Sequence, residues 1–267
     1  MSTPQPYEVH ALKYAHHVRQ ARENFIGGDP HDGPMPLDFF VWVVTGPGGT
    51  FVIDTGFSAE TAKARSREHI RCPAASLSML GLDPNAVTDV VVTHMHYDHA
   101  GNLDKFPKAR FHIQDSEMAY VTGRCMCHAP LRHPFSVEDA CLMVRHVYGG
   151  RVCFHDGEET LAPGLSVHHI GGHTAGLQVV RVWTKRGWLV LASDASHFYA
   201  NMNEVRPFPI VLDVMKMIEG YGTLRKLADS QEQVIPGHDP KVLALYPASK
   251  PGLEGIACRL DLGPKEG

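Results

Sequence analysis

His94-Met-His-Tyr-Asp-His99 places four side chains of metal-ligand type within six residues. The segment directly follows the apolar, β-branched run 87–93, which predicts a buried strand. Alternate residues of a strand point to opposite faces, so the four side chains can converge only if the strand ends and the chain turns here. The first two histidines then share one direction, while the aspartate and the last histidine face a second point. Two metal ions about 3.5–4 Å apart fit this arrangement.

The alternative is a chance cluster of polar residues in a loop. Histidines and an aspartate buried beside an apolar strand cost several kcal/mol unless they have partners, which favours metal binding. Further candidate ligands are His173, Asp194 and His238, each directly after a predicted strand. Singly, each of these residues is more often a turn or cap residue. Their common placement at strand ends instead predicts one shared site.

The hydrophobic pattern alternates clusters of strands with helices. Strands are predicted over 37–44, 50–54, 87–93, 110–114, 165–170, 177–184, 188–193 and 233–235. Helices are predicted over 58–70, 100–106, 115–122, 136–148 and 211–228, with Ser58 and Ser136 at two N-termini, and 123–135 is predicted to be a surface loop or lid. This order predicts an α/β fold of two sheets packed face to face with outer helices. No linker divides the chain, so residues 1–267 are expected to form a single domain.

Composition excludes several classes of protein. The chain has 267 residues, with 25 Lys and Arg against 29 Asp and Glu, so its formal net charge is −4. This balance gives no bulk attraction to nucleic acid or to an anionic membrane surface. No window approaches the ~20 apolar residues of a membrane span. The start, MSTPQPYEVHALKY, shows no secretion signal, and the six cysteines are expected to be reduced thiols. We therefore expect a cytoplasmic protein.

The motifs together resemble a known family. The matching segments are Phe51-Val-Ile-Asp-Thr-Gly56, His94–His99, Gly172-His173-Thr174, Ser193-Asp194 and Gly237-His238. In this order they resemble the metallo-β-lactamase superfamily over nearly the whole chain. Length and the stretch His96-Tyr-Asp-His-Ala-Gly-Asn102 are most similar to its N-acyl-homoserine lactonase branch. The resemblance implies a four-layer αβ/βα sandwich with two mixed sheets and a dinuclear metal site.

The resemblance also implies a distribution of seven ligands. His94, His96 and His173 would hold one ion, Asp98, His99 and His238 the other, and Asp194 would bridge both. Five neutral histidines and two carboxylates favour two Zn²⁺ ions, although iron, manganese or cobalt can replace zinc in similar sites. Asp54 is expected to orient a ligand from outside the site, the alternative being a turn residue.

The implied activity is hydrolysis of a cyclic ester, an N-acyl-homoserine lactone or a related lactone. A metal-bridging hydroxide would attack the carbonyl, with Asp98 and Asp194 acting through the ions. The resemblance implies a lactonase that acts in quorum quenching, with a small-molecule substrate and a homodimeric assembly. The alternatives are an esterase, amidase or lactamase on another small carbonyl compound, an iron-dependent sulfur dioxygenase, or a binding protein on the same fold.

The sequence departs from the lactonase pattern near the substrate. The pattern places a tyrosine three residues after the bridging aspartate, where this chain has His197, with Tyr199 two positions further on. Either side chain is a candidate proton donor, and a surface histidine is the alternative for the first. Leu177 stands where the family commonly has another histidine. Both departures leave the ligand set intact and concern the substrate.

Two loops are expected to wall the pocket. Their apolar residues are Phe198, Tyr199, Met202 and Phe208 in one, and Met126, Leu131 and Phe135 in the other. Such walls suit a partly apolar ring or acyl group, and packing beneath the loops is the alternative. Cys125-Met-Cys127-His128 lacks a second cysteine pair, so its cysteines are interpreted as small loop residues rather than as a further metal site.

Overall fold

The strand β2 (Leu37–Gly46) shows how the layers are built. The computed structural model describes residues 4–265, and in it the first eight residues of β2 are all buried. Because the side chains of a strand alternate between its faces, uninterrupted burial means that both faces of the sheet are covered. Phe40 and Trp42 pack into the core between the two sheets, whereas Val43 packs into a second core beneath the outer helices.

The first sheet has eight strands and mixed pairing. Its order is β13 (Ala257–Arg259), β1 (Glu8–His17), β2, β3 (Gly49–Ile53), β5 (Asp89–Val91), β6 (Arg110–Gln114) and β7 (Val152–His155), with β4 (Glu68–His69) beside β1. The strands β1, β2 and β3 pair antiparallel, whereas β3, β5, β6 and β7 pair parallel. The carboxyl ends of β3 and β5 therefore lie at the same edge of the sheet.

The second sheet has five strands. Its order is β12 (Val234–Pro236), β11 (Gly187–Ser193), β10 (Gln178–Thr184), β9 (Leu165–His169) and β8 (Glu158–Ala162). Only the pair formed by β11 and β12 is parallel. Valines and leucines of β9, β10 and β11 meet the inner face of the first sheet in the central core.

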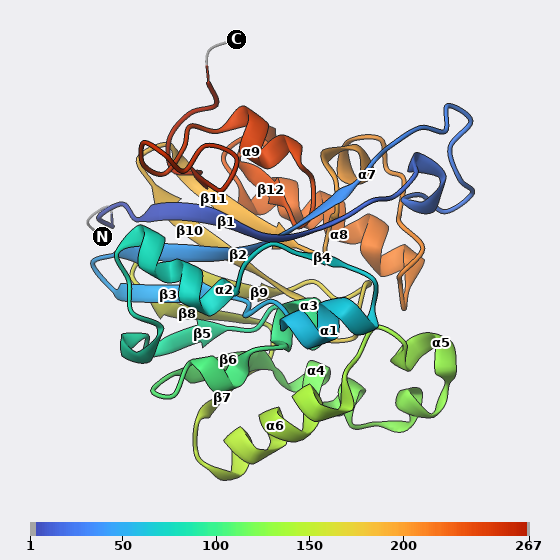
Figure 1. The fold of residues 1–267 in the computed structure, drawn as a ribbon, viewed down its shortest axis with the longest axis horizontal. Coiled ribbons are helices and arrows are strands. Elements are labelled where there is room, and N and C mark those ends of the chain that lie inside the picture. Colours follow the sequence, from blue (N-terminus) through green and yellow to red (C-terminus); the bar gives the residue numbers. More distant parts are fainter. Residues whose placement is uncertain (1–3, 266–267) are drawn as a thin grey trace.

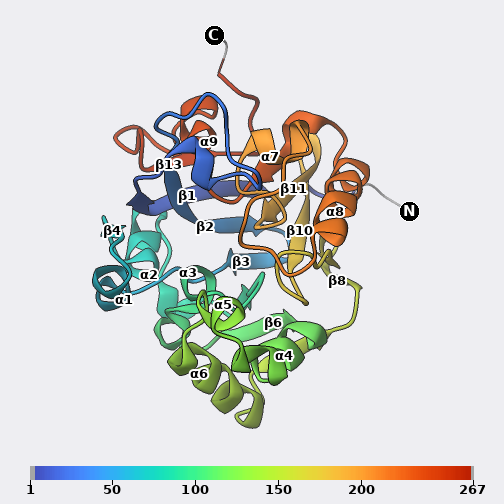
Figure 2. The ribbon, with the colours of Figure 1, turned by 90° about the vertical axis from the view of Figure 1, so that its right-hand side faces the viewer.

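Helices cover the outer faces of both sheets (Figures 1 and 2). The helices of the described residues are α1 (Ala59–Ala64), α2 (Pro73–Ser76), α3 (Tyr97–Ala100), α4 (Asp115–Val121), α5 (Ala129–Arg132), α6 (Val137–Tyr148), α7 (Tyr199–Asn203), α8 (Val214–Leu227) and α9 (Lys241–Leu245). Side chains of α2, α4 and α6 pack on the first sheet, and those of α7 and α8 pack on the second. The predicted α/β fold, a four-layer αβ/βα sandwich, is confirmed.

Within residues 4–265, none of the helices combines the length and apolar content needed to cross a membrane.

The prediction of one helix over 58–70 is wrong in its length. Ser58 caps α1 as expected, because its hydroxyl oxygen accepts the N–H of Thr61 at 3.1 Å. The helix ends at Ala64, and Ser66 adopts a φ of 54°, in the left-handed region. The chain then turns into β4, which pairs with β1 instead of continuing as helix.

Other differences concern short elements. A helix over 100–106 is not formed; α3 ends at Ala100, and a 3₁₀ turn follows over Leu103–Lys105. The predicted loop 123–135 contains a 3₁₀ turn, Arg124–Cys127, and then α5. The strand β1 was not predicted, because His, Lys and Tyr interrupt its apolar pattern although most of the strand is buried.

Candidate metal centre

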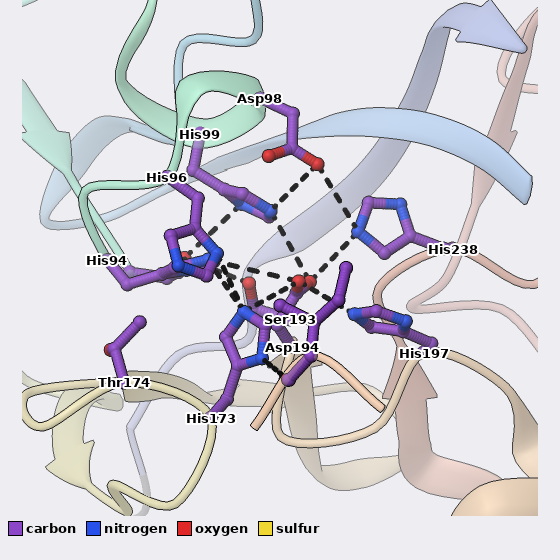
Figure 3. Close-up of polar contacts among 12 residues, drawn as sticks. His94, His96, Asp98, His99, His173, Thr174, Ser193, Asp194, His197 and His238 are labelled. Atoms are coloured by element: carbon purple, nitrogen blue, oxygen red, sulfur yellow. Dashed lines mark hydrogen bonds and ion pairs between the residues drawn. The ribbon is translucent and has the colours of Figure 1, made fainter. Parts of the chain in front are cut away.

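Strand ends from both sheets deliver the candidate ligands to one place (Figure 3). The segment 94–99 follows β5 and includes the start of α3, while His173 lies in the loop between β9 and β10. Asp194 directly follows β11, and His238 comes two residues after β12. Ligand sites at the carboxyl ends of strands are the general rule in α/β folds.

One group consists of His94, His96, His173 and Asp194, whose ligand atoms all lie within 4.8 Å of one another. The Nε2 atom of His173 lies 3.2 Å from Nε2 of His94 and 2.9 Å from Nδ1 of His96. It also lies 3.2 Å from Oδ2 of Asp194. Three imidazole nitrogens and one carboxylate oxygen therefore face one point.

A second group consists of Asp98, His99 and His238. Oδ2 of Asp98 lies 3.6 Å from Nε2 of His99 and 3.8 Å from Nε2 of His238. The other oxygen of Asp194, Oδ1, lies 3.3 Å from Nε2 of His99 and 2.9 Å from Nε2 of His238. The Asp194 carboxylate therefore presents one oxygen to each group.

Outer partners fix the orientation of three of the rings. Nδ1 of His173 lies 2.7 Å from the carbonyl oxygen of Ile210, and Nδ1 of His238 lies 3.0 Å from that of Asp38. Since a carbonyl oxygen only accepts, Nδ1–H must donate, which leaves the Nε2 lone pair directed at the cluster.

The third ring is that of His99, which contacts Asp54 as expected. Oδ2 of Asp54 lies 2.7 Å from Nδ1 of His99, and both of its oxygens accept hydrogen bonds from Thr93. Asp54 and Ser193 have left-handed φ angles of 63° and 46°, and such backbone strain is common at functional sites. Asp54 thus contacts a candidate ligand from outside the cluster.

Among the buried polar atoms without a hydrogen-bond partner in the described part of the chain are two ligand atoms of the cluster, Nε2 of His99 and Oδ1 of Asp194. They lie 3.3 Å apart without hydrogen-bond geometry. Burying such atoms without a partner is costly. A divalent cation between them would satisfy both atoms, so the residues present fit a metal.

The surroundings of His94, His96 and Asp194 favour the protonation states that metal binding requires. Burial lowers the pKa of His94 and His96 well below the usual value, and the neighbouring imidazoles add to this shift. Burial alone would raise the pKa of Asp194, but His238, His197 and His99 outweigh it and lower that pKa well below its usual range. Neutral imidazoles and an ionised carboxylate are the ligand forms of these side chains.

Sequence reasoning missed Glu117, a fully buried residue of α4. Its carboxylate accepts hydrogen bonds from the N–H of Met95 at 2.8 Å, the hydroxyl of Thr174 at 2.7 Å and the N–H of Gly176 at 2.9 Å. Glu117 therefore ties the segment 94–99 to the loop that carries His173. No sequence signal distinguishes it from an ordinary acidic residue in the first turn of a helix.

The two candidate proton donors lie in different places. His197 is buried at the cluster, with Nε2 2.9 Å from Oδ2 of Asp194 and its ring stacked on Phe208 at 3.5 Å between centroids. The ring of Tyr199 instead lines a separate cavity with Tyr246. The expectation that Tyr199 reaches the substrate is corrected accordingly, and His197 alone remains a candidate.

The pocket that opens onto the cluster has a volume of about 230 Å³. Of the seven apolar residues expected to wall it, none lines it, and only Leu131 lines the adjoining pocket. Phe198, Met202 and Phe208 pack in the cores beneath the loops. The cationic side chains of Arg19, Arg65 and Arg67 line the pocket instead; the three are among the lining residues that sequence reasoning missed.

In the part of the chain that the structure describes, no candidate metal group contains Cys125 or Cys127. Both thiols are free.

Comparisons with known proteins define the family. A family model described as the metallo-beta-lactamase superfamily matches residues 40–243. The chain therefore belongs to the metallo-beta-lactamase superfamily. N-acyl homoserine lactonase AttM of Azorhizobium caulinodans is 29% identical over 232 residues, which cover 80% of this chain and 85% of that protein.

Solved structures share the fold. One is an N-acyl homoserine lactone hydrolase with its product, N-hexanoyl-L-homoserine, bound at the catalytic metal centre; the TM-score is 0.73 at 17% identity, covering 90% of this chain and 96% of that one. Another is AidC, a dizinc quorum-quenching lactonase, with a TM-score of 0.69 at 16% identity over 89% of this chain and 90% of that one. At these identities the likeness shows the fold alone.

Proposed function

We propose that this chain is a dinuclear zinc hydrolase that opens a lactone ring. The observation that carries the proposal is the pair of ligand groups sharing the Asp194 carboxylate, with one oxygen toward each group. His94, His96 and His173 would hold one cation, and Asp98, His99 and His238 the other. Five imidazoles and two carboxylates favour zinc over harder cations, with iron, manganese and cobalt as alternatives.

When bound, two such cations lower the pKa of water and polarise a carbonyl, which suits hydrolysis. The residues of the chain would hold the cations and transfer the proton that ring opening requires. Ring opening adds water to the carbonyl carbon, breaks the bond to the ring oxygen and passes one proton from water to the leaving alkoxide. We assign that proton transfer to His197, because its Nε2 contacts Asp194 and its ring lines the pocket.

The relatives support a lactone as the substrate class. AttM is named as an N-acyl homoserine lactonase, and the two structural neighbours are named as lactone hydrolases. A quorum-quenching role follows if N-acyl homoserine lactones are hydrolysed. We also propose that residues 1–267 form one domain, since both halves of the chain contribute to the central core.

Metal analysis combined with a substrate panel tests the proposal. The purified protein should contain about two zinc ions per chain and should hydrolyse lactones to hydroxy acids, and chelation should abolish this activity. The panel contains homoserine lactones of varied acyl length, other γ- and δ-lactones, lactams and simple esters. Re-addition of zinc after chelation serves as the control.

Each other outcome identifies an alternative. Turnover of esters, amides or lactams without lactones would make the protein a different hydrolase. Iron with oxygen uptake on a persulfide would make it a sulfur dioxygenase. A protein that retains no metal would fit a binding function.

The role of His197 is tested by His197→Ala. We expect kcat to fall by about 10²-fold or more, the usual contribution of general acid–base catalysis, with the metal content unchanged. His31→Ala removes an exposed histidine that does not line the pocket and should leave kcat unchanged. Identical kinetics for the two variants would remove His197 from the mechanism.

A further inference from the structure

Three arginines line the pocket above the candidate metal centre. Arg19 follows β1, and Arg65 and Arg67 follow α1, so two distant segments supply them. They share the pocket with Asp98 and His238. A substrate bound at the metal centre therefore lies within reach of three permanent positive charges.

The hydrogen bonds of Arg65 and Arg67 go to neutral acceptors rather than to carboxylates. Arg65 donates to the carbonyl oxygen of Phe135 at 3.0 Å, and Arg67 donates to the hydroxyl of Tyr97 at 3.1 Å and to the carbonyl oxygen of Arg65 at 2.8 Å. All of these acceptors are neutral. Among residues 4–265, no carboxylate lies within 4.0 Å of either guanidinium group.

Among the described residues, the acids that line the pocket are Asp98, Asp194 and Glu23. The carboxylate of Glu23 approaches Arg19 only to 4.0 Å, and its side chain is 46% exposed, so it neutralises the arginines weakly. Arg19 itself is 15% exposed. Buried or half-buried cations normally have a close counter-charge, whereas here Asp139 acts on Arg65 only from beyond 4.0 Å and none of the described carboxylates pairs with Arg67.

Neighbouring groups respond to these charges. Burial lowers the pKa of His17 to about 4, and Arg67 and Arg19 lower it further. Burial also lowers the pKa of Arg19, an effect that Glu23 opposes and Arg67 strengthens. His17 is therefore neutral and adds no charge. Arg19 and Arg67 lie close enough to influence both His17 and each other.

We propose that the physiological substrate is a small lactone bearing a carboxylate, which Arg19, Arg65 and Arg67 bind while the ring carbonyl faces the metal centre. The inference rests on the proposed lactonase function and refines its substrate class. The planar guanidinium fork matches a carboxylate in geometry and charge. The pocket has a volume of about 230 Å³ and must hold both the ring and the charged group. This favours a carboxylate, which is the smallest common organic oxyanion.

A matched substrate pair tests the inference. We use γ-butyrolactone carrying a carboxylate on its γ-carbon, and the primary amide of the same acid, which has nearly the same shape without the charge. For the unaltered protein, kcat/KM should be at least about tenfold higher for the acid than for the amide, since a hydrogen bond to a charged group contributes roughly 10–100-fold. High salt should reduce this preference.

Variants then locate the selectivity. Arg67→Gln and Arg19→Gln should each lower kcat/KM for the acid by about 10–100-fold, mainly through KM, and change the amide less than about threefold. Arg67→Lys keeps the charge and should retain part of the preference. Arg145→Gln removes an exposed arginine of α6 and should change neither substrate. Metal content is measured for every variant, so that damage to the site is recognised.

The possible failures are distinguishable. Equal turnover of acid and amide by the unaltered protein overturns the carboxylate inference and leaves the lactonase proposal standing. An equal loss on both substrates in Arg19→Gln and Arg67→Gln makes the arginines structural and also overturns it. Failure to hydrolyse any lactone of the wider panel overturns the lactonase proposal itself.

Discussion

Asp194→Asn should abolish nearly all turnover and lower the metal content of the purified protein. One oxygen of Asp194 faces His173 and the other faces His238, so the carboxylate is the shared element of both ligand groups. An asparagine has one oxygen and one NH₂ group, and the NH₂ group would repel a cation. We expect a loss of roughly 10³-fold or more, because removing a single donor aimed at developing charge already costs about 10²–10³-fold.

The measurement is kcat/KM together with metal analysis of the purified variant. Asp156→Asn, which changes an exposed aspartate after β7, is the control and should match the unaltered protein. Full activity of Asp194→Asn with two ions bound would refute the bridging role.

Gly237→Ala should damage both the stability of the protein and the bridging carboxylate. A Cβ at this position would lie 2.7 Å from the carbonyl oxygen of Ser193 and 2.8 Å from Oδ1 of Asp194. Neither group can move freely, since Ser193 ends β11 and Asp194 faces both ligand groups. We expect about 1–3 kcal/mol of destabilisation from overpacking. A loss of about 10²-fold in activity should follow from the displaced carboxylate.

Thermal unfolding, zinc affinity and kcat are the measurements. Gly222→Ala adds the same methyl group inside α8, where no atom lies within 4 Å of the new Cβ. It should stabilise the protein by up to about 1 kcal/mol through helix propensity, with unchanged activity. If both alanine variants have the same stability and activity, the close contacts at Gly237 are not required for either.

The positions of the ligand candidates could be predicted because their signal is local. A histidine or aspartate directly after an apolar strand is visible in the sequence, and parallel strand ends meet at one edge. The expected contact between Asp54 and a candidate ligand is present, at His99. The layered fold was also predictable, since clusters of predicted strands alternate with predicted helices along the chain.

Other features depend on tertiary contacts that no local pattern encodes. Glu117 looks like an exposed first-turn acid until α4 packs against the loop holding Thr174 and Gly176. The direction of the Tyr199 ring is set by its position at the start of α7, which turns it toward Tyr246. Arg65 and Arg67 reach the pocket because the chain turns sharply after α1, where one long helix was predicted.

The candidate ligands are divided between the two sheets, with the segment 94–99 supplied by the first and His173, Asp194 and His238 supplied by the second. Neither half of the polypeptide alone carries a complete coordination sphere for both ions. If two cations bind as proposed, their coordination would be complete only after the two halves have docked. Once bound, the ions would act as a cross-link between the halves, so that separating the sheets would also require release of metal.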